Sequence, residues 1–324
     1  FMMINIKPKT IVVTGGLGFI GSRFIEYVYN NSSHNIINVD KHTYAADHDR
    51  ISPSLREDTD RYRYLKADIC DDICKHTEIE AADYVVNFAA ESHVDNSIED
   101  GKPFMDTNIG GVYNLLEQFK DAPNLKRFVQ ISTDEVYGDM DDYRGKTYAT
   151  ESFALKPSSY YSATKASADL LVQAASRTFG IPYLITRTCN NFGLGQDPEK
   201  FLPKIAKCIR EGGTVPVYGD GEQVREWMHV DDNVAVIYGL MMTAPENNIY
   251  NIGTGYEFTN EVVRLVGKAV GGEVKYEYVK DRLGHDRRYA LDCAKGNRLL
   301  LDGFIPYNLE SYIDETFGNS VWIT

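Results

Sequence analysis

The chain has 324 residues, of which 43% are hydrophobic and 25% are charged, and its formal net charge is −13. This composition is ordinary for a soluble globular protein, and the length suggests about two domains. No apolar run approaches the roughly 20 residues of a membrane helix, so we expect no membrane partner. The net negative charge and the lack of clustered Lys and Arg also argue against a nucleic-acid partner.

The first predicted element is a β-branched strand at residues 9–14, followed by a glycine turn and a helix. Gly15, Gly18 and Gly21 form the pattern GxxGxxG, a variant of the dinucleotide-binding fingerprint. The first two glycines let the backbone turn tightly beside a pyrophosphate, and the third allows close packing of helix on strand. The N-terminus of the helix then presents unpaired N–H groups to the phosphates. A glycine triplet alone is weak support, because it often marks only a tight turn.

A second strand is predicted at 35–40 and ends on Asp40, 19 residues after Gly21. A carboxylate at this place can accept a hydrogen bond from a ribose 2′-hydroxyl and would repel a 2′-phosphate, so NAD is favoured over NADP. The alternative is that Asp40 only caps a loop.

Further buried strands are predicted at 62–66, 84–88, 127–131 and 183–186, with helical spacing between most of them. Apolar strands that alternate with helices imply a parallel sheet covered on both faces, which is a doubly wound Rossmann fold of the α/β class. Beyond residue 187 we expect a loop at 190–198, a helix at 201–210 and a strand at 214–218. We therefore predict a Rossmann domain at 1–187 and a smaller α+β domain at 188–324, with segments near 230–252 returning to the first.

The five cysteines are odd in number and scattered: Cys70, Cys74, Cys189, Cys208 and Cys293. Reduced thiols in the cytoplasm are the simplest interpretation. Cys70 and Cys74 could share a helix face, but no second pair of ligands lies nearby in the sequence. We therefore expect no metal site.

The strand at 127–131 leads into Thr133, Asp134 and Glu135. Open α/β sheets bind their ligands at this carboxyl edge. Two adjacent carboxylates there suggest an acid and a base whose surroundings separate their pKa values. The alternative for a bare Asp-Glu pair is a solvated acidic loop.

Tyr161 and Lys165 form the pattern YxxxK at the start of a helix that continues to residue 179. Residues four apart share a helix face, so the ammonium group can lie close to the phenol. That positive charge, together with an oxidised nicotinamide, would lower the pKa of Tyr161 and let it act as a base near neutral pH. The alternative is an ordinary exposed helix surface.

These residues together resemble the nucleotide-sugar branch of the extended short-chain dehydrogenases, and within it the dTDP-glucose (or UDP-glucose) 4,6-dehydratases. The resemblance runs from about residue 11 to about residue 313 and rests on seven motifs, at 14–22, 38–45, 89–95, 132–138, 161–165, 198–200 and 282–289. The Thr-Asp-Glu string is the most specific of them. Departures from the family pattern include Leu17, Asn96, Leu283 and the run 192–196, where Phe-Gly-Leu-Gly-Gln replaces a more usual Tyr-Gly-Pro.

The resemblance implies a reaction in three stages. Tyr161, supported by Lys165 and Thr133, takes the proton of the sugar O4 as hydride passes from C4 to NAD. Glu135 then removes the C5 proton, which the C4 ketone has made acidic, and Asp134 protonates the leaving C6 hydroxyl. Hydride finally returns to C6. The product is a 4-keto-6-deoxy sugar, an early intermediate towards rhamnose or other deoxysugars.

The resemblance also assigns binding residues. For NAD, the glycine turn and matching positions elsewhere give Gly15, Gly18, Phe19, Ile20, Gly21, Asp40, Lys41, Thr43, Asp68, Ile69, Ala89, Ala90, Ser92, Thr107, Tyr161, Lys165 and Asn191. For the nucleoside-diphosphate glucose they are His93, Thr133, Asn190, Lys200, Phe201, Arg225, Asn260, Arg282, His285, Asp286 and Tyr289. The two arginines suit a diphosphate because a guanidinium can bind two oxygens at once.

Two other functions compete with dehydration. A nucleotide-sugar 4-epimerase or decarboxylase would use the same scaffold, but the Asp134-Glu135 pair argues against it. A non-catalytic NAD-binding module would need none of Tyr161, Lys165, Asp134 and Glu135. The family also implies a homodimer, which would pair the helices near 110–119 and 163–175. The sequence leaves the choice between uridine and thymidine open, because the two bases differ by one methyl group.

Overall fold

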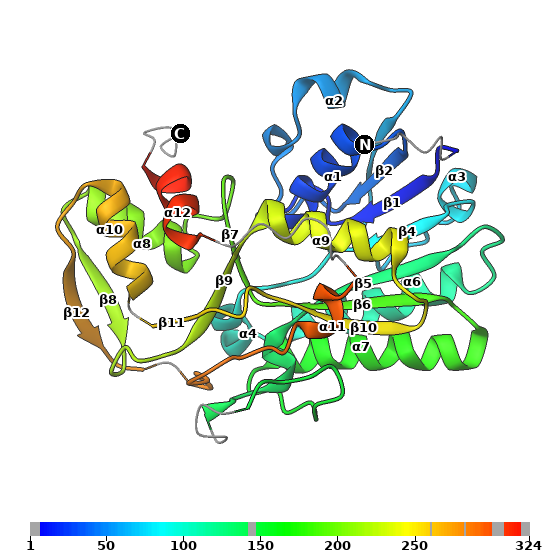
Figure 1. Ribbon diagram of the computed structural model, residues 1–324. Coiled ribbons are helices and arrows are strands. Elements are labelled where there is room, and N and C mark those ends of the chain that lie inside the picture. The colour runs from blue at the N-terminus through cyan, green and yellow to red at the C-terminus, as the bar shows by residue number, and fades with distance from the viewer. Residues whose placement is uncertain (1–6, 142–146, 260, 282, 300–307, 319–324) are drawn as a thin grey trace.

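The computed structural model describes residues 7–141, 147–259, 261–281, 283–299 and 308–318. A parallel sheet of seven strands in the order β10-β6-β5-β4-β1-β2-β3 forms the larger of two lobes (Figure 1). Its strands are β1 (Thr10–Thr14), β2 (Asn35–Asp40), β3 (Tyr62–Lys66), β4 (Tyr84–Asn87), β5 (Arg127–Thr133), β6 (Tyr183–Thr188) and β10 (Asn248–Ile252). The predicted doubly wound α/β fold is confirmed.

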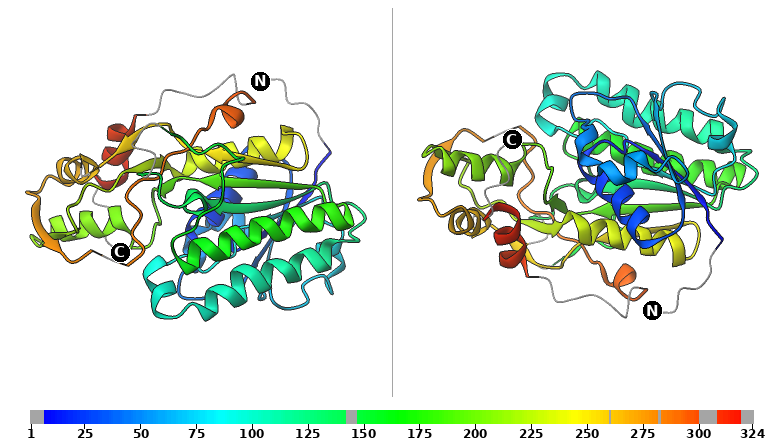
Figure 2. Two further views of the ribbon diagram at one scale, coloured as in Figure 1. Left: turned by 90° about the horizontal axis from the view of Figure 1, so that it is seen from below. Right: turned by 90° about the horizontal axis from the view of Figure 1, so that it is seen from above.

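Helices cover both faces of this sheet (Figure 2). One face carries α1 (Phe19–Asn31) and α9 (Val230–Thr243), and the other carries α6 (Val112–Phe119) and α7 (Tyr160–Phe179). Alternate residues of β1 therefore enter two separate cores: Ile11 and Val13 pack on the α1 side, and Val12 packs on the α6 side. Burial on both faces explains why these strands are apolar throughout.

Short elements connect the main layers. They are η1 (His48–Arg50), α2 (Pro53–Glu57), α3 (Thr77–Glu80), α4 (Val94–Glu99), α5 (Lys102–Phe104), the π-helical turn η2 (Met105–Gly111), the 3₁₀ turn η3 (Asp134–Tyr137) and α11 (Ala294–Asn297). The chain leaves the sheet after β6 and returns through α9, which packs on α1, to β10, which pairs with β6.

The smaller lobe has its own apolar core. It contains a three-stranded sheet of β7 (Asn190–Phe192), β9 (Arg225–His229) and β11 (Glu257–Phe258), and a parallel pair of β8 (Thr214–Tyr218) and β12 (Lys275–Val279). Its helices are α8 (Phe201–Arg210), α10 (Glu261–Val270) and α12 (Leu309–Phe317). The predicted helix at 201–210 and strand at 214–218 are both present.

Helix α7 carries two of the predicted catalytic residues, and its start is set by a capping box. Ser159 accepts a hydrogen bond from the backbone N–H of Ser162, and the Ser162 hydroxyl accepts one from the backbone N–H of Ser159. Such reciprocal caps satisfy N–H groups that the first turn leaves unpaired. Tyr161 therefore lies in the first turn of α7, and Lys165 lies one turn later on the same face.

Candidate active site

A cavity of about 340 Å³ lies where the strands of the large sheet end. The glycine turn forms one wall of it. Gly15 has φ +70°, and a Cβ at this position would lie 2.6 Å from the backbone nitrogen of Ala89, so only glycine fits. A Cβ on Gly21 would lie 2.3 Å from the carbonyl oxygen of Gly15, so the third glycine is needed for helix packing.

Asp40, at the end of β2, is buried and lines this cavity. Its Oδ2 accepts a hydrogen bond from the backbone N–H of Leu17 at 3.0 Å, and its Oδ1 accepts one from His42 at 2.8 Å. Asp40 therefore ties the loop after β2 to the glycine turn as well as facing the cavity. The next residue, Lys41, forms an ion pair of 2.6 Å with Asp68, which follows β3.

The structure brings the predicted NAD-binding residues to this one cavity. Its lining includes Gly15, Gly18, Phe19, Ile20, Gly21, Asp40, Lys41, Thr43, Asp68, Ile69, Ala89, Ala90, Ser92, Thr107, Tyr161, Lys165 and Asn191. Sequence reasoning missed other lining residues, including Tyr44, Arg50, Glu91 and Gln196. These come from loops and, for Arg50, from the short turn η1, where no periodic pattern indicates which side chain faces inward.

Tyr161 and Lys165 lie in the same cavity below the end of β5. The Lys165 ammonium donates to the carbonyl oxygen of Ile131. Burial lowers the pKa of Lys165 to about 8, and the carboxylate of Asp169 opposes that change. Burial, and then the carboxylates of Glu135 and Asp134, raise the pKa of Tyr161, whereas a hydrogen bond with Thr133 lowers it. Lys165 is not among the groups that shift the pKa of Tyr161, so the expected lowering by its ammonium group is not found in the protein alone.

Asp134 and Glu135 begin the 3₁₀ turn that follows β5. The Thr133 hydroxyl donates to Oδ1 of Asp134 at 3.1 Å and accepts from the backbone N–H of Glu135 at 3.3 Å. Burial, the Glu135 carboxylate and the Glu226 carboxylate raise the pKa of Asp134 well above its ordinary value. Asp134 is thus buried in surroundings that favour its protonated form, whereas Glu135 is half-buried and faces both cavities. A solvated acidic loop is excluded for this pair.

A second cavity of about 280 Å³ adjoins the first and extends into the smaller lobe. Both cavities are lined by Glu135 and Lys200, among others, so they form one continuous site. Of the predicted substrate residues, the second cavity is lined by His93, Asn190, Lys200, Phe201, Arg225 and His285, and the first by Thr133. Asn260 and Arg282 lie outside the described residues.

Apolar and aromatic side chains line the far end of the second cavity. Phe201 stacks on Trp227, with ring centroids 5.9 Å apart and an interplanar angle of 16°. Val217, Phe258 and Val263 line the same region. Flat aromatic surfaces and aliphatic neighbours suit a planar base. Of these residues, only Phe201 was predicted, because the others occupy strand and helix positions that a core would equally explain.

The segment 283–292 brings Arg225 into place. The Arg225 guanidinium donates to the carbonyl oxygens of Val224 and Asp286, both at 2.8 Å, and lies 4.2 Å from the ring centroid of Tyr289. Tyr289 in turn donates to Asp286 at 2.8 Å. Asp286 and Tyr289 are buried and are not part of the lining of either cavity, so they support Arg225 from behind.

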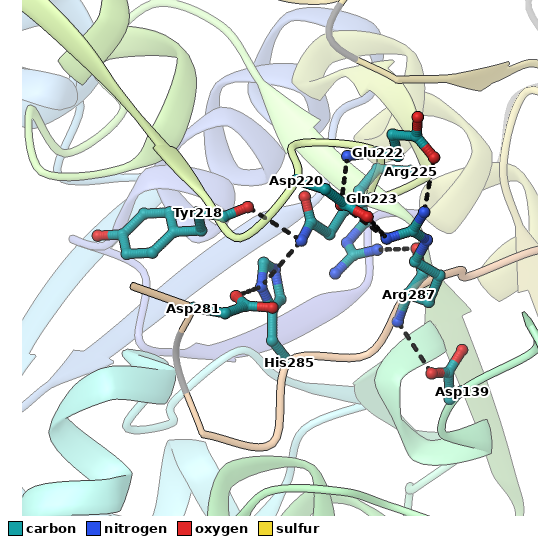
Figure 3. A network of polar contacts seen from close by, with 9 residues as sticks. All are labelled: Asp139, Tyr218, Asp220, Glu222, Gln223, Arg225, Asp281, His285 and Arg287. Carbon is teal, nitrogen blue, oxygen red and sulfur yellow. Dashed lines mark hydrogen bonds and ion pairs between the residues drawn. The ribbon is translucent and has the colours of Figure 1, made fainter. Parts of the chain in front are cut away.

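A polar network holds the same segment at His285 and Arg287 (Figure 3). Arg287 bonds both carboxylate oxygens of Asp220 and one of Glu222 at 2.7 Å, and its backbone N–H donates to Asp139 at 3.0 Å. His285 lies 2.6 Å from Asp281. The segment therefore bridges the turn after β8 and the large lobe.

His93, Asp197 and Glu199 have ligand atoms within 4.8 Å of one another, the one such group in the described parts of the chain. Burial lowers the pKa of His93, and the nearby Lys200 lowers it further. Lys200 thus already places a positive charge beside this group, and we assign no metal to it.

The fold and the site define a class: an enzyme with a dinucleotide site on a Rossmann sheet, a Tyr-Lys pair in the same cavity, and a second cavity that adjoins the first. Residues 11–253 match the model of the NAD dependent epimerase/dehydratase family. The chain belongs to this family, and the resemblance stated from its motifs is confirmed.

Named relatives cover almost the whole chain. It is 47% identical to the low-salt glycan biosynthesis protein Agl12 of Haloferax volcanii, over 95% of this chain and 99% of that protein. It is 39% identical to dTDP-glucose 4,6-dehydratase 1 of Escherichia coli, over 97% of this chain and 94% of that protein. Among solved structures, DesIV of Streptomyces venezuelae, a dTDP-glucose 4,6-dehydratase with NAD and TYD bound, is 38% identical, covers 95% of both chains and superposes with a TM-score of 0.88.

Proposed function

We propose that this protein is an NAD-dependent nucleotide-sugar 4,6-dehydratase that converts dTDP-glucose, or UDP-glucose, to the 4-keto-6-deoxy sugar. The observation that carries the proposal is that the buried Asp134 lines the first cavity with Tyr161 and with Glu135, which also lines the second cavity. An epimerase needs the Tyr-Lys pair but has no use for this acid and base. The relatives named above support the same activity.

The first cavity fits a dinucleotide. The turn of Gly15, Gly18 and Gly21 lines it, so the backbone there can approach a pyrophosphate, and Asp40 can accept a hydrogen bond from a ribose hydroxyl. Asn191 and Gln196 each present a buried oxygen that lacks a hydrogen-bond partner within the described residues. Bound NAD would supply the hydride acceptor, which later returns the same hydride.

Tyr161 acts as the base for the sugar O4–H in this account. Its phenol is buried, and the hydrogen bond with Thr133 holds its orientation. Protein burial alone opposes ionisation, so the charge of Lys165 and the positive charge of the bound oxidised cofactor must favour the phenolate. Lys165 reaches the end of β5 from the next turn of α7.

Asp134 and Glu135 divide the elimination between them. Because the pKa of Asp134 is raised well above its ordinary value, its surroundings favour the protonated carboxyl group, which can deliver a proton to the leaving C6 hydroxyl. Glu135 is more exposed and reaches both cavities, so it is the base for the C5 proton. Removal of the C5 proton follows oxidation at C4, because a neighbouring ketone is needed to make that proton acidic.

The second cavity would hold the nucleoside diphosphate. Arg225 presents a guanidinium fixed by backbone carbonyl oxygens, and the stacked Phe201 and Trp227 suit the base. We assign the dinucleotide to the lobe formed by residues up to 187 together with 230–252. The nucleotide sugar is assigned to the remainder of 188–324.

The direct experiment is to incubate the purified protein separately with dTDP-glucose and UDP-glucose and to follow both by mass spectrometry. We expect loss of one water from the sugar. We also expect dTDP-glucose to react faster, but only by a factor of several, because one buried methyl group contributes roughly 0.8 kcal/mol. Loss of water from neither substrate would refute the dehydratase proposal.

We also propose a homodimer that forms through helices α6 and α7. These neighbouring helices expose large apolar side chains: Tyr113 is 55% exposed, Leu170 57% and Phe179 49%. Exposed apolar groups that gather on one face mark association surfaces. Light scattering should give twice the chain mass, and Leu170→Asp should shift the protein to monomer. A monomeric native protein would refute this assignment.

The cysteines and helices are compatible with the expected location. All five cysteines are free thiols. Within the residues that the structure describes, no helix is long and apolar enough to cross a membrane. The cytoplasm stays our proposal for where the enzyme acts.

A further inference from the structure

Arg50 connects three segments that are distant in the sequence. It lies at the end of η1, in the loop that follows β2, and its side chain is half-buried. Its Nη1 donates to the carbonyl oxygens of Leu17 at 3.0 Å and Ala45 at 2.6 Å. Its Nε donates to the carbonyl oxygen of Gly195 at 2.9 Å. One guanidinium thus joins the glycine turn, the loop after β2 and the loop after β7.

Gly195 is shaped to receive this side chain. Its φ is +83°, a conformation that favours glycine, and the Arg50 side chain packs on the side of Gly195 where a Cβ would stand, at 3.6–3.7 Å. The residue belongs to the run 192–196, which departs from the usual family pattern. Arg50 bonds the backbone carbonyl oxygen of Gly195, and the left-handed backbone at this residue sets the direction of that oxygen.

The half-buried Arg50 and the exposed Ala45 line the dinucleotide cavity where it reaches the protein surface, which we call its mouth. Arg50, Ala45 and Gln196 all line that cavity. The loop after β2 makes a second contact across the mouth, because the Tyr44 hydroxyl donates to Glu91 at 3.2 Å. A dinucleotide in the cavity would lie beneath loops that these side chains hold to the glycine turn and to the loops after β4 and β7.

We propose that Arg50 and Gly195 form a clasp over the bound dinucleotide and slow its release. This inference rests on the proposed function, in which the hydride taken from C4 returns to C6 of the same sugar. The cofactor must then stay bound until the hydride has returned, since early release would leave an oxidised sugar and a reduced dinucleotide in solution. A hydrogen bond that holds two loops together across the mouth directly opposes that escape.

The clasp is not a pH switch. Burial lowers the pKa of Arg50, and the carboxylates of Asp47, Asp197 and Asp40 raise it. A guanidinium nevertheless stays charged throughout the physiological range. Its hydrogen bonds to the three carbonyl oxygens therefore do not change with pH in that range.

The test measures cofactor release without catalysis. The protein is loaded with isotope-labelled NAD and diluted into excess unlabelled NAD, and loss of label is followed for the native protein and for Arg50→Ala. We expect release to be roughly tenfold faster in Arg50→Ala, because a hydrogen bond from a charged donor to a carbonyl oxygen is lost. Arg56→Ala is the matched control: Arg56 lies in α2 nearby, is exposed, pairs with Asp49 at 3.3 Å and is not part of the cavity lining. Its release rate should equal that of the native protein.

Arg50→Lys is the second variant, in case the alanine protein does not fold. Lysine keeps the charge but lacks the Nε–H that bonds Gly195, so release should again be faster than in the native protein. Release at the native rate from a folded Arg50→Ala or Arg50→Lys protein would overturn the clasp. Native protein that holds no NAD at all would instead overturn the proposed cofactor.

Discussion

Arg187 and Asp169 form an ion pair that is closed to solvent, with Nε of the guanidinium 2.9 Å from Oδ2 of the carboxylate. Arg187 is 2% exposed and Asp169 is fully buried. Asp169 follows Lys165 by one turn of α7, and its charge raises the pKa of Lys165 against the opposing effect of burial. The Asp169 carboxylate therefore has two effects: it neutralises the buried Arg187 on β6, and it raises the pKa of Lys165.

Asp169→Asn tests this relationship. Removing one partner leaves a buried guanidinium uncompensated, which costs about 3–5 kcal/mol of unfolding free energy. The pKa of Lys165 should fall below its value of about 8, so the alkaline limb of the pH–rate profile should move to lower pH. Urea unfolding and the pH dependence of kcat measure the two effects. Glu261→Gln, which breaks an exposed pair with Arg264, should change neither. If the alkaline limb did not move, Asp169 would not control the pKa of Lys165.

Asp134→Asn should stabilise the protein while it removes activity. The pKa of Asp134 is raised in the folded state, so the folded protein binds more protons than the unfolded chain between the ordinary carboxyl pKa and the raised one. Folding stability then falls as pH rises through that window, and asparagine removes this loss. Thermal unfolding should show a small difference between variant and native protein at pH 4 and a larger gain for the variant at pH 8. A gain that is independent of pH would contradict the raised pKa.

Asp134→Asn and Glu135→Gln should fail at different steps. With dTDP-glucose in deuterated water, Asp134→Asn should still exchange the C5 hydrogen, because Glu135 remains as base. Glu135→Gln should recover substrate without deuterium at C5. Neither variant should form the dehydrated product at more than about a thousandth of the native rate, as for loss of a general acid or base. Exchange in Glu135→Gln but not in Asp134→Asn would reverse the assigned roles.

Arg225→Lys should weaken substrate binding more than it slows chemistry. A planar guanidinium fits the carbonyl oxygens of Val224 and Asp286 and stacks on Tyr289, whereas an ammonium group cannot reproduce this geometry. We expect KM for dTDP-glucose to rise roughly tenfold, with kcat changed by less than a factor of about three. Steady-state kinetics measures both constants. Arg264→Lys, at an exposed position of α10, is the control. A fall in kcat at unchanged KM would exclude diphosphate binding by Arg225.

The large sheet and its cofactor cavity were predictable because their signals are local. The glycines must lie within a few residues of β1, and Asp40 must end β2, so spacing alone brings them to one edge of a parallel sheet. The Tyr161–Lys165 pair follows from helix geometry in the same way. These features depend on positions close in sequence and on the rule that open α/β sheets bind their ligands at the carboxyl ends of the strands.

The remaining features depend on contacts between distant segments. Arg50 and Gly195 are 145 residues apart, and nothing near either residue indicates its partner. Glu226 raises the pKa of Asp134 from β9, a strand of the other lobe. Asp286 and Tyr289 were predicted at the substrate, but they lie behind Arg225 because the whole segment 283–292 folds back on it. Their direct role at the substrate stays a prediction.

The central claim is that a hydride leaves C4 and returns to C6 of the same sugar with loss of water between. The most direct measurement uses dTDP-glucose that carries deuterium at C4, with the product analysed by NMR and mass spectrometry. We predict a 4-keto-6-deoxy sugar in which the deuterium has moved to C6. A product that retains every atom of the substrate, with deuterium still at C4 and only the configuration there inverted, would contradict the account and establish an epimerase.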